Sequence, residues 1–144
     1  MAFLQIDYKS EALMRGVNIK VILPSDGMAG KWEPPYKTLY LLPGYSATAT
    51  ELITYLGLRG QSELKGIAIV LPDGENLFYQ DIPDRMTFYS TYVGKELVEV
   101  TRKMLPLSTK REDTFIGGIS MGGYGALYNG KLSFFTRVYQ FVSS

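Results

Sequence analysis

The chain has 144 residues, with 15 basic and 14 acidic side chains and a formal net charge of +1. One domain is expected at this length, and the balanced charge argues against nucleic acid or an anionic membrane as a partner, because both require a concentrated basic surface. The sequence has no cysteine, which excludes disulfides, thiolate zinc sites and a thiol nucleophile. It also has no histidine, the usual general base at neutral pH and the commonest metal ligand.

The sequence shows no targeting or membrane-spanning segment. The first nine residues have no basic region ahead of an apolar one, and Gln5 and Asp7 interrupt their apolar run. No stretch approaches the roughly 18 uninterrupted apolar residues of a membrane span. We therefore expect a cytoplasmic protein that does not associate with membranes.

Two antiparallel strands are expected at the start of the chain. Apolar and polar residues alternate over residues 3–8 and again over residues 17–23, where Pro24 ends the pattern. Such alternation is typical of strands that are buried on one face.

Short, continuous apolar runs follow at residues 39–42, 67–71 and 114–116, and turn residues close each run. Runs of this kind suit strands that are buried on both faces, as in a parallel sheet covered by helices. Because parallel strands end at the same edge of the sheet, the loops that follow them should share that edge.

Helical patterns separate these runs. A capping box at Thr48–Glu51 predicts a helix that continues to about residue 56, and Gly130 would end another over residues 121–129. A longer helix is predicted from about Arg85 to Met104. Its buried face would carry Tyr89, Val93, Leu97, Val100 and Met104. Strands alternating with helices predict an α/β fold with a mostly parallel sheet and flanking helices.

The strongest local signal is the G-x-S-x-G pattern Gly118-Ile119-Ser120-Met121-Gly122. In a nucleophile elbow the serine lies on a tight strand-to-helix turn, so that small residues are needed on either side of it. The pattern directly follows a predicted buried strand and directly precedes a predicted helix. The alternative is a glycine-rich turn that only packs closely against a neighbour.

Residues 110–127 resemble the esterase D / tributyrin esterase-like family of α/β-hydrolases, relatives of S-formylglutathione hydrolase and of Firmicute acetylesterases. Residues 39–44 resemble the strand and turn that come earlier in the family, and residues 70–74 and 78–81 resemble the loop that follows. Residues 135–144 resemble its sixth strand. The resemblance implies that residues 1–144 are the amino-terminal part of an α/β-hydrolase-type domain, truncated after about the sixth strand.

The resemblance also implies the roles of particular residues. Ser120 would be the nucleophile, and the backbone N–H groups of Met121 and Tyr45 would form the oxyanion hole. Gly44, Phe78 and Tyr79 would contact the substrate, with Phe78 and Tyr79 walling the acyl pocket. No cofactor and no metal is implied.

The chain departs from the family at two points. Pro43 stands where the family usually has histidine, and the acid and the histidine of the triad would lie beyond Ser144. No other residue is an obvious base, since nothing orients Lys131 toward the serine. Carboxylates on the predicted loops are expected to be solvated rather than metal ligands, and tyrosines at helical spacing to belong to the core: Asp73, Asp81, Asp84, Tyr89 and Tyr92.

The sequence thus predicts a serine carboxylesterase that hydrolyses short-chain acyl or acetyl esters in its complete form, with little or no turnover by these 144 residues alone. One alternative is a non-catalytic hydrolase remnant that self-associates or binds a partner through an exposed sheet edge, since the tail from Phe134 to Val142 is strongly apolar. Another is an enzyme whose acid and histidine come from a second chain.

Overall fold

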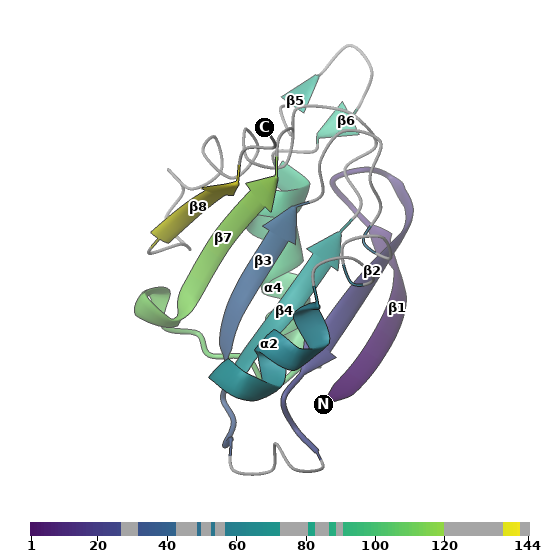
Figure 1. Ribbon diagram of the computed structural model, residues 1–144. Helices are drawn as coiled ribbons and strands as arrows, with labels where there is room; N and C mark the ends of the chain where they lie inside the picture. Colours follow the sequence, from purple (N-terminus) through teal and green to yellow (C-terminus); the bar gives the residue numbers. More distant parts are fainter. Residues whose placement is uncertain are drawn as a thin grey trace.

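A computed structural model describes residues 1–26, 32–42, 49, 53, 57–72, 81–82, 87–88, 91–119 and 137–141; residues 81–82, 87–88, 119 and 137–141 are described by their backbone alone. The main sheet has the strand order β1-β2-β4-β3-β7-β8 (Figure 1). Its strands are β1 (Ala2–Ser10), β2 (Arg15–Leu23), β3 (Lys37–Leu42), β4 (Ile67–Pro72), β7 (Thr114–Ile119) and β8 (Arg137–Phe141). A separate two-stranded sheet pairs β5 (Asp81–Ile82) with β6 (Thr87–Phe88).

The predicted antiparallel pair at the start of the chain is confirmed. β1 pairs with β2 from Ala2↔Leu23 to Ser10↔Arg15. Along β2, Val17, Ile19 and Val21 are buried and point to the core, while the residues between them are more exposed up to Lys20. This alternation explains why the period-two pattern was readable in the sequence.

The predicted parallel sheet is also confirmed. β3 pairs in parallel with β4 and with β7, and β7 pairs in parallel with β8. β2 runs antiparallel to both of its neighbours, so it is the one described strand of the main sheet that opposes the common direction. The central strands are buried on both faces, as the continuous apolar runs indicated: Tyr40, Leu42, Val70, Leu71 and Ile116 are at most 1% exposed.

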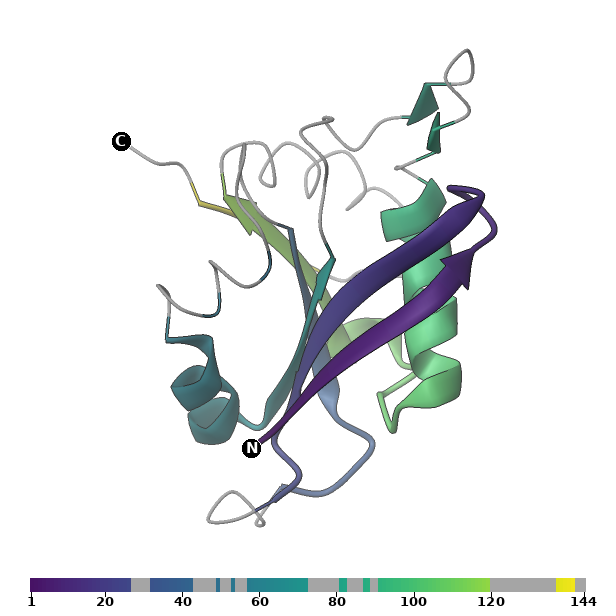
Figure 2. The same ribbon diagram turned by 90° about the vertical axis from the view of Figure 1, so that its right-hand side faces the viewer.

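Helices cover both faces of the sheet (Figure 2). On one face lies α2 (Leu58–Lys65), whose Leu58 packs in a cluster with Leu41 and Ile69. On the other face lies a single continuous helix, made of a π-helical turn η3 (Tyr92–Glu96) followed by α4 (Leu97–Met104), and its Val93 and Leu97 join the larger cluster. A short 3₁₀ turn, η4 (Arg111–Asp113), precedes β7.

The predicted helix over residues 85–104 starts too early, because residues 87 and 88 form β6. Its predicted face is partly wrong as well. Val93 and Leu97 are buried as expected, but Met104 is 46% exposed and Val100 is half-buried. The reason is the π-helical turn, closed by the bond from the Leu97 N–H to the Tyr92 carbonyl, which inserts one residue and rotates the helix surface. The buried residues are therefore Tyr92, Val93, Gly94, Leu97, Val98 and Thr101.

The other predicted helices are only partly described. Ala49 and Ile53 are helical, as expected for a helix that starts at the capping box, whereas residues 121–129 lie outside the described residues. Helix α2 was not predicted, because only Leu58 and Ser62 are buried on it and they form too short a pattern.

Helix α2 ends against the indole ring of Trp32. Gly66 follows the helix with φ +66°, and its N–H donates to the Ser62 carbonyl oxygen at 2.9 Å. The Trp32 indole N–H donates to the Glu63 carbonyl oxygen at 2.7 Å. A Cβ on Gly66 would lie 2.4 Å from a carbon of the Trp32 ring. The contact therefore requires glycine both for its backbone conformation and for its missing side chain.

Candidate active site

The carboxyl ends of the parallel strands meet at one edge of the sheet. β3, β4 and β7 all point toward this edge in Figure 1. In the sequence, residues 43–45 follow β3, residues 73–80 follow β4 and Ser120 follows β7. Ligands of open α/β sheets bind outside this edge, so we call it the carboxyl edge and treat it as the candidate site.

The G-x-S-x-G motif starts inside β7. Gly117 and Gly118 are buried in the strand and pair with Leu41 and Leu42 of β3. The last residue of β3 thus lies directly beside the first glycine of the motif. The chain segments that begin at Pro43 and at Ser120 consequently leave the sheet from neighbouring strands.

The predicted catalytic and substrate-contacting residues themselves lie outside the described residues. Most of the loop carboxylates, tyrosines and the lysine considered as alternatives also lie outside them. Two are described: Asp81 by its backbone and Tyr92 in full. Tyr92 is 1% exposed and belongs to the larger core cluster, which confirms the interpretation of this tyrosine as a core residue. Those outside the described residues are Ser120, Met121, Gly44, Tyr45, Phe78, Tyr79, Asp73, Asp84, Tyr89 and Lys131.

A buried hydrogen bond ties β3 to the helix just below the carboxyl edge. The Tyr40 hydroxyl and the Thr101 hydroxyl lie 2.7 Å apart, and the Thr101 hydroxyl also donates to the Leu97 carbonyl oxygen at 2.7 Å. Burial raises the pKa of Tyr40 to about 12, so its phenol stays protonated at neutral pH. The Tyr40–Thr101 hydrogen bond therefore holds β3, which leads to Pro43, against helix α4.

The β1–β2 hairpin extends past the carboxyl edge. Ile19 of β2 pairs with Pro72, the last residue of β4, so that residues 15–18 continue beyond it. At about 3.3 Å per residue they carry the hairpin turn roughly 13 Å further. In Figure 2 this turn lies beside the first turn of the long helix.

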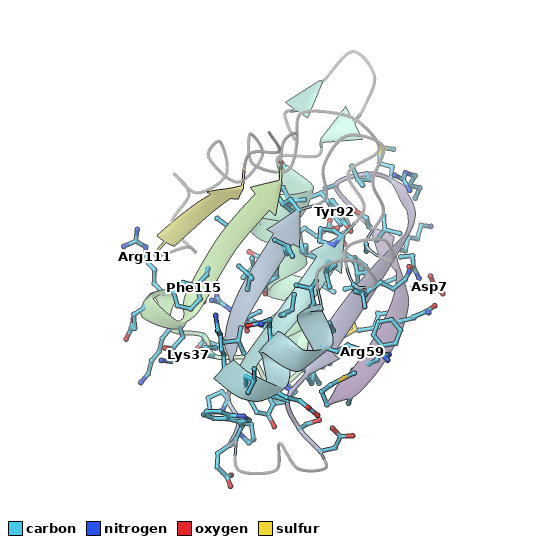
Figure 3. The ribbon with its side chains drawn as sticks, viewed as in Figure 1. Asp7, Lys37, Arg59, Tyr92, Arg111 and Phe115 are labelled. Atoms are coloured by element: carbon cyan, nitrogen blue, oxygen red, sulfur yellow. The ribbon has the colours of Figure 1, made fainter. Side chains whose placement is uncertain are left out.

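A carboxylate missed in the sequence joins the hairpin to the helix. Glu96 accepts hydrogen bonds from the Tyr8 hydroxyl at 3.2 Å, the Ser10 hydroxyl at 2.5 Å and the Ala12 N–H at 2.7 Å. Burial, followed by the nearby Tyr92 and Glu96, raises the pKa of Tyr8 well above its ordinary value. Tyr92, labelled in Figure 3, lies on the same helix near the carboxyl edge. The sequence shows Glu96 only as an acidic residue four positions after Tyr92. That spacing does not identify hydrogen-bond partners that lie 84 or more residues away.

Within the described ranges, no group of three or more acidic side chains is arranged to hold a metal ion. Over those same ranges, no helix has both the length and the apolar character needed to cross a membrane.

The chain is similar to known esterases over most of its length. The Esterase family profile matches residues 10–144. An acetyl esterase of Caldicellulosiruptor saccharolyticus is 41% identical in an alignment of 135 positions, which covers 90% of this chain and 51% of the relative.

Solved structures agree with this similarity. The fluorophosphonate-binding serine hydrolase F of Staphylococcus aureus, solved with substrate bound, superposes with a TM-score of 0.75 at 29% identity, covering 88% of this chain and 50% of that one. An S-formylglutathione hydrolase of the same organism superposes with a TM-score of 0.74 at 30% identity, again covering 88% and 50%. The chain spans about half the length of these relatives. Because the family profile matches residues 10–144 and the fold superposes on these solved hydrolases, the chain belongs to the Esterase family and has the α/β-hydrolase type of fold.

Proposed function

We propose that this chain carries the nucleophile and the oxyanion hole of a serine carboxylesterase that acts on short-chain acyl esters, acetyl esters among them. The observation that carries the proposal is the pairing of Leu42 with Gly118. Because the two strands are parallel neighbours, Ser120 and Tyr45 follow strand ends that lie side by side. Acyl transfer requires such a meeting of nucleophile and oxyanion donors.

Each proposed residue has a chemical role. The Ser120 hydroxyl oxygen attacks the ester carbonyl carbon, and the alcohol leaves with a proton as the acyl-serine forms. The N–H groups of Met121 and Tyr45 donate to the negative oxygen that develops on the carbonyl. Gly44, Phe78 and Tyr79 contact the acyl group. Water then hydrolyses the acyl-serine and frees the carboxylic acid.

The comparisons support this assignment through what the relatives are named for. The curated relative is an acetyl esterase, and one of the solved structures is a serine hydrolase that binds fluorophosphonate. Fluorophosphonates react with activated serine nucleophiles. We infer from those names, together with the motif, that the ester substrate of this chain has an acetyl or similarly short acyl group.

The missing histidine limits what these 144 residues do alone. Without a general base, the Ser120 hydroxyl is a poor nucleophile at neutral pH. Triads that lose a member retain only about 10³–10⁴-fold catalysis over water, from the oxyanion hole and binding. We therefore propose that the isolated chain is inactive or weakly active.

The isolated chain provides a direct test. Triad residues act as a unit, so with the histidine absent we expect Ser120→Ala to change the hydrolysis of p-nitrophenyl acetate by less than about tenfold. Labelling by a fluorophosphonate probe should be equally weak in both proteins. The measurement is initial rate and labelled fraction against a buffer blank. Fast turnover or labelling that disappears in Ser120→Ala would contradict the proposed inactivity while supporting Ser120 as the nucleophile.

A second candidate function is self-association through the sheet edge. In the described part of the chain, β8 (Arg137–Phe141) ends the strand order and pairs only with β7. An edge strand has unpaired backbone groups that attract another strand, and β8 contains Val138, Tyr139 and Phe141. We propose that two copies pair along β8.

Size-exclusion chromatography over a range of protein concentrations tests this proposal. We expect a dimer at high concentration and a shift to monomer in Val138→Lys, because lysine on an edge strand discourages pairing. Lys9→Ala on the opposite edge strand β1 is the matched control and should leave the dimer intact. A monomer at every concentration would refute pairing along β8.

A further inference from the structure

The β1–β2 hairpin turn and the start of the long helix meet beside the carboxyl edge. The far end of that helix is fixed at the other edge, where the Tyr36 N–H donates to the Pro106 carbonyl oxygen at 2.9 Å, just before β3 begins. The helix therefore runs back along the strands, and Tyr92 at its start lies at the carboxyl edge (Figure 3). The hairpin reaches the same place because residues 15–18 extend past Pro72.

Glu96 holds these two elements together. Its carboxylate accepts hydrogen bonds from the hydroxyls of Tyr8 and Ser10, in β1, and from the Ala12 N–H in the turn. The Ser10 hydroxyl oxygen accepts in turn from the Leu13 N–H at 3.0 Å, and the Leu13 side chain is buried in the core. A single carboxylate thus binds three donors between Tyr8 and Ala12, and hydrogen bonds to an ionised group are stronger than those between neutral groups.

The π-helical turn places Glu96 where it meets the hairpin. The turn is closed by the Leu97 N–H and the Tyr92 carbonyl oxygen, and it rotates the helix surface by one residue. Leu97 and Val98 then enter the core, while Tyr92 and Glu96 both contact Tyr8. Turns of this kind are rare and occur frequently at functional sites.

We propose that Glu96 is a positioning residue. Its hydrogen bonds, which we call the clasp, hold the β1–β2 turn against the π-helical turn and fix both beside the carboxyl edge. The statement that this part of the molecule borders an acyl-binding site rests on the proposed function. The contact of Glu96 with the turn does not depend on it. The rival interpretation is that Glu96 only adds to overall stability, as any half-buried carboxylate with several hydrogen bonds does.

Amide hydrogen exchange separates the two interpretations, since it is measured residue by residue without any ester turnover. Turn amides usually exchange fast, and the described acceptor of the Ala12 N–H is the Glu96 carboxylate. In Glu96→Ala we expect Ala12 to exchange at least about tenfold faster relative to Tyr40 in the central strand β3. The amides of the π-helical turn, residues 92–96, should also speed up. Glu96→Gln keeps an acceptor oxygen and should recover part of the protection.

Two further variants keep the test sharp. Glu99→Ala, on an exposed position of the same helix, is the control and should leave Ala12 unchanged. Ser10→Ala removes the acceptor of the Leu13 N–H and should speed Leu13 more than Ala12. Ser10→Ala also tests how the turn is held if Glu96→Ala fails to fold.

Two results would overturn the proposal. In one, exchange at Ala12 is unchanged in both Glu96 variants, which means that the carboxylate does not hold the turn. In the other, Ala12, residues 92–96 and Tyr40 all speed up by the same factor, which means that Glu96 acts on global stability alone. Because neither result involves Ser120, failure of the clasp and failure of the proposed esterase chemistry are distinguishable.

Discussion

Supplying a histidine to this chain should raise its ester hydrolysis by at least about 10²-fold, the usual contribution of general acid–base catalysis. The protein for this experiment is a chimera in which residues 1–144 are followed by the part of the Caldicellulosiruptor acetyl esterase that the chain does not match. The family resemblance implies that the added part contains the acid and the histidine of the triad. The proposed nucleophile and oxyanion donors would then have a base to accept the serine proton, which is the reason for the gain. The measurement is the initial rate with p-nitrophenyl acetate, compared with the 144-residue chain alone.

Ser120→Ala in the chimera is the control. It should return the rate to that of the 144-residue chain, since loss of one triad member costs nearly as much as loss of all three. The added part without residues 1–144 should also be slow. A folded chimera that gains no activity, or that keeps its activity in Ser120→Ala, would contradict Ser120 as the nucleophile.

Gly66→Ala should lower the free energy of unfolding by about 2–5 kcal/mol. An L-residue at φ +66° costs about 1–2 kcal/mol in backbone strain. The new Cβ also lies 2.4 Å from the Trp32 ring, and such overpacking typically costs about 1–3 kcal/mol. Denaturant unfolding measures the loss, and Trp32 is the single tryptophan of the chain, so its fluorescence reports the contact directly.

Gly57→Ala is the matched control for this substitution. Gly57 has φ +60° at the other end of helix α2, but a Cβ there would have no neighbour within 4 Å. Gly57→Ala should therefore cost only the backbone strain, about 1–2 kcal/mol. Equal losses at Gly57 and Gly66 would show that the indole ring moves away at no cost, and the packing argument would be wrong.

Much of the sheet was predictable, because its signals are local. A strand that is buried on both faces must be apolar along its length, and Leu39–Leu42 and Ile67–Leu71 satisfy that condition without reference to any partner. The hairpin likewise carries its alternation within each strand. The long helix was predicted less well, because a π-helical turn changes the periodicity on which the buried face was assigned, and β6 occupies part of the predicted span.

The candidate site, too, was predictable only where its signals are local. The motif around Ser120 is recognisable from five adjacent residues, and the position of its first glycine beside Leu42 follows from the strand order. Glu96 was not predictable, because its partners Tyr8, Ser10 and Ala12 lie between 84 and 88 residues away. Contacts formed by folding at such separations leave no pattern in a single sequence.

The position of β3 between β4 and β7 has a consequence for how the protein is made. Both neighbours of β3 follow it in the chain, and β7 begins 72 residues after β3 ends, from Leu42 to Thr114. At the usual synthesis rate of about 5–20 residues per second, one side of β3 waits roughly 4–14 s for its partner. During that time the growing chain has an open apolar strand on the ribosome, with the motif of Ser120 still to be translated. Chaperone demand should therefore be greatest just before β7, the strand that leads to Ser120, emerges.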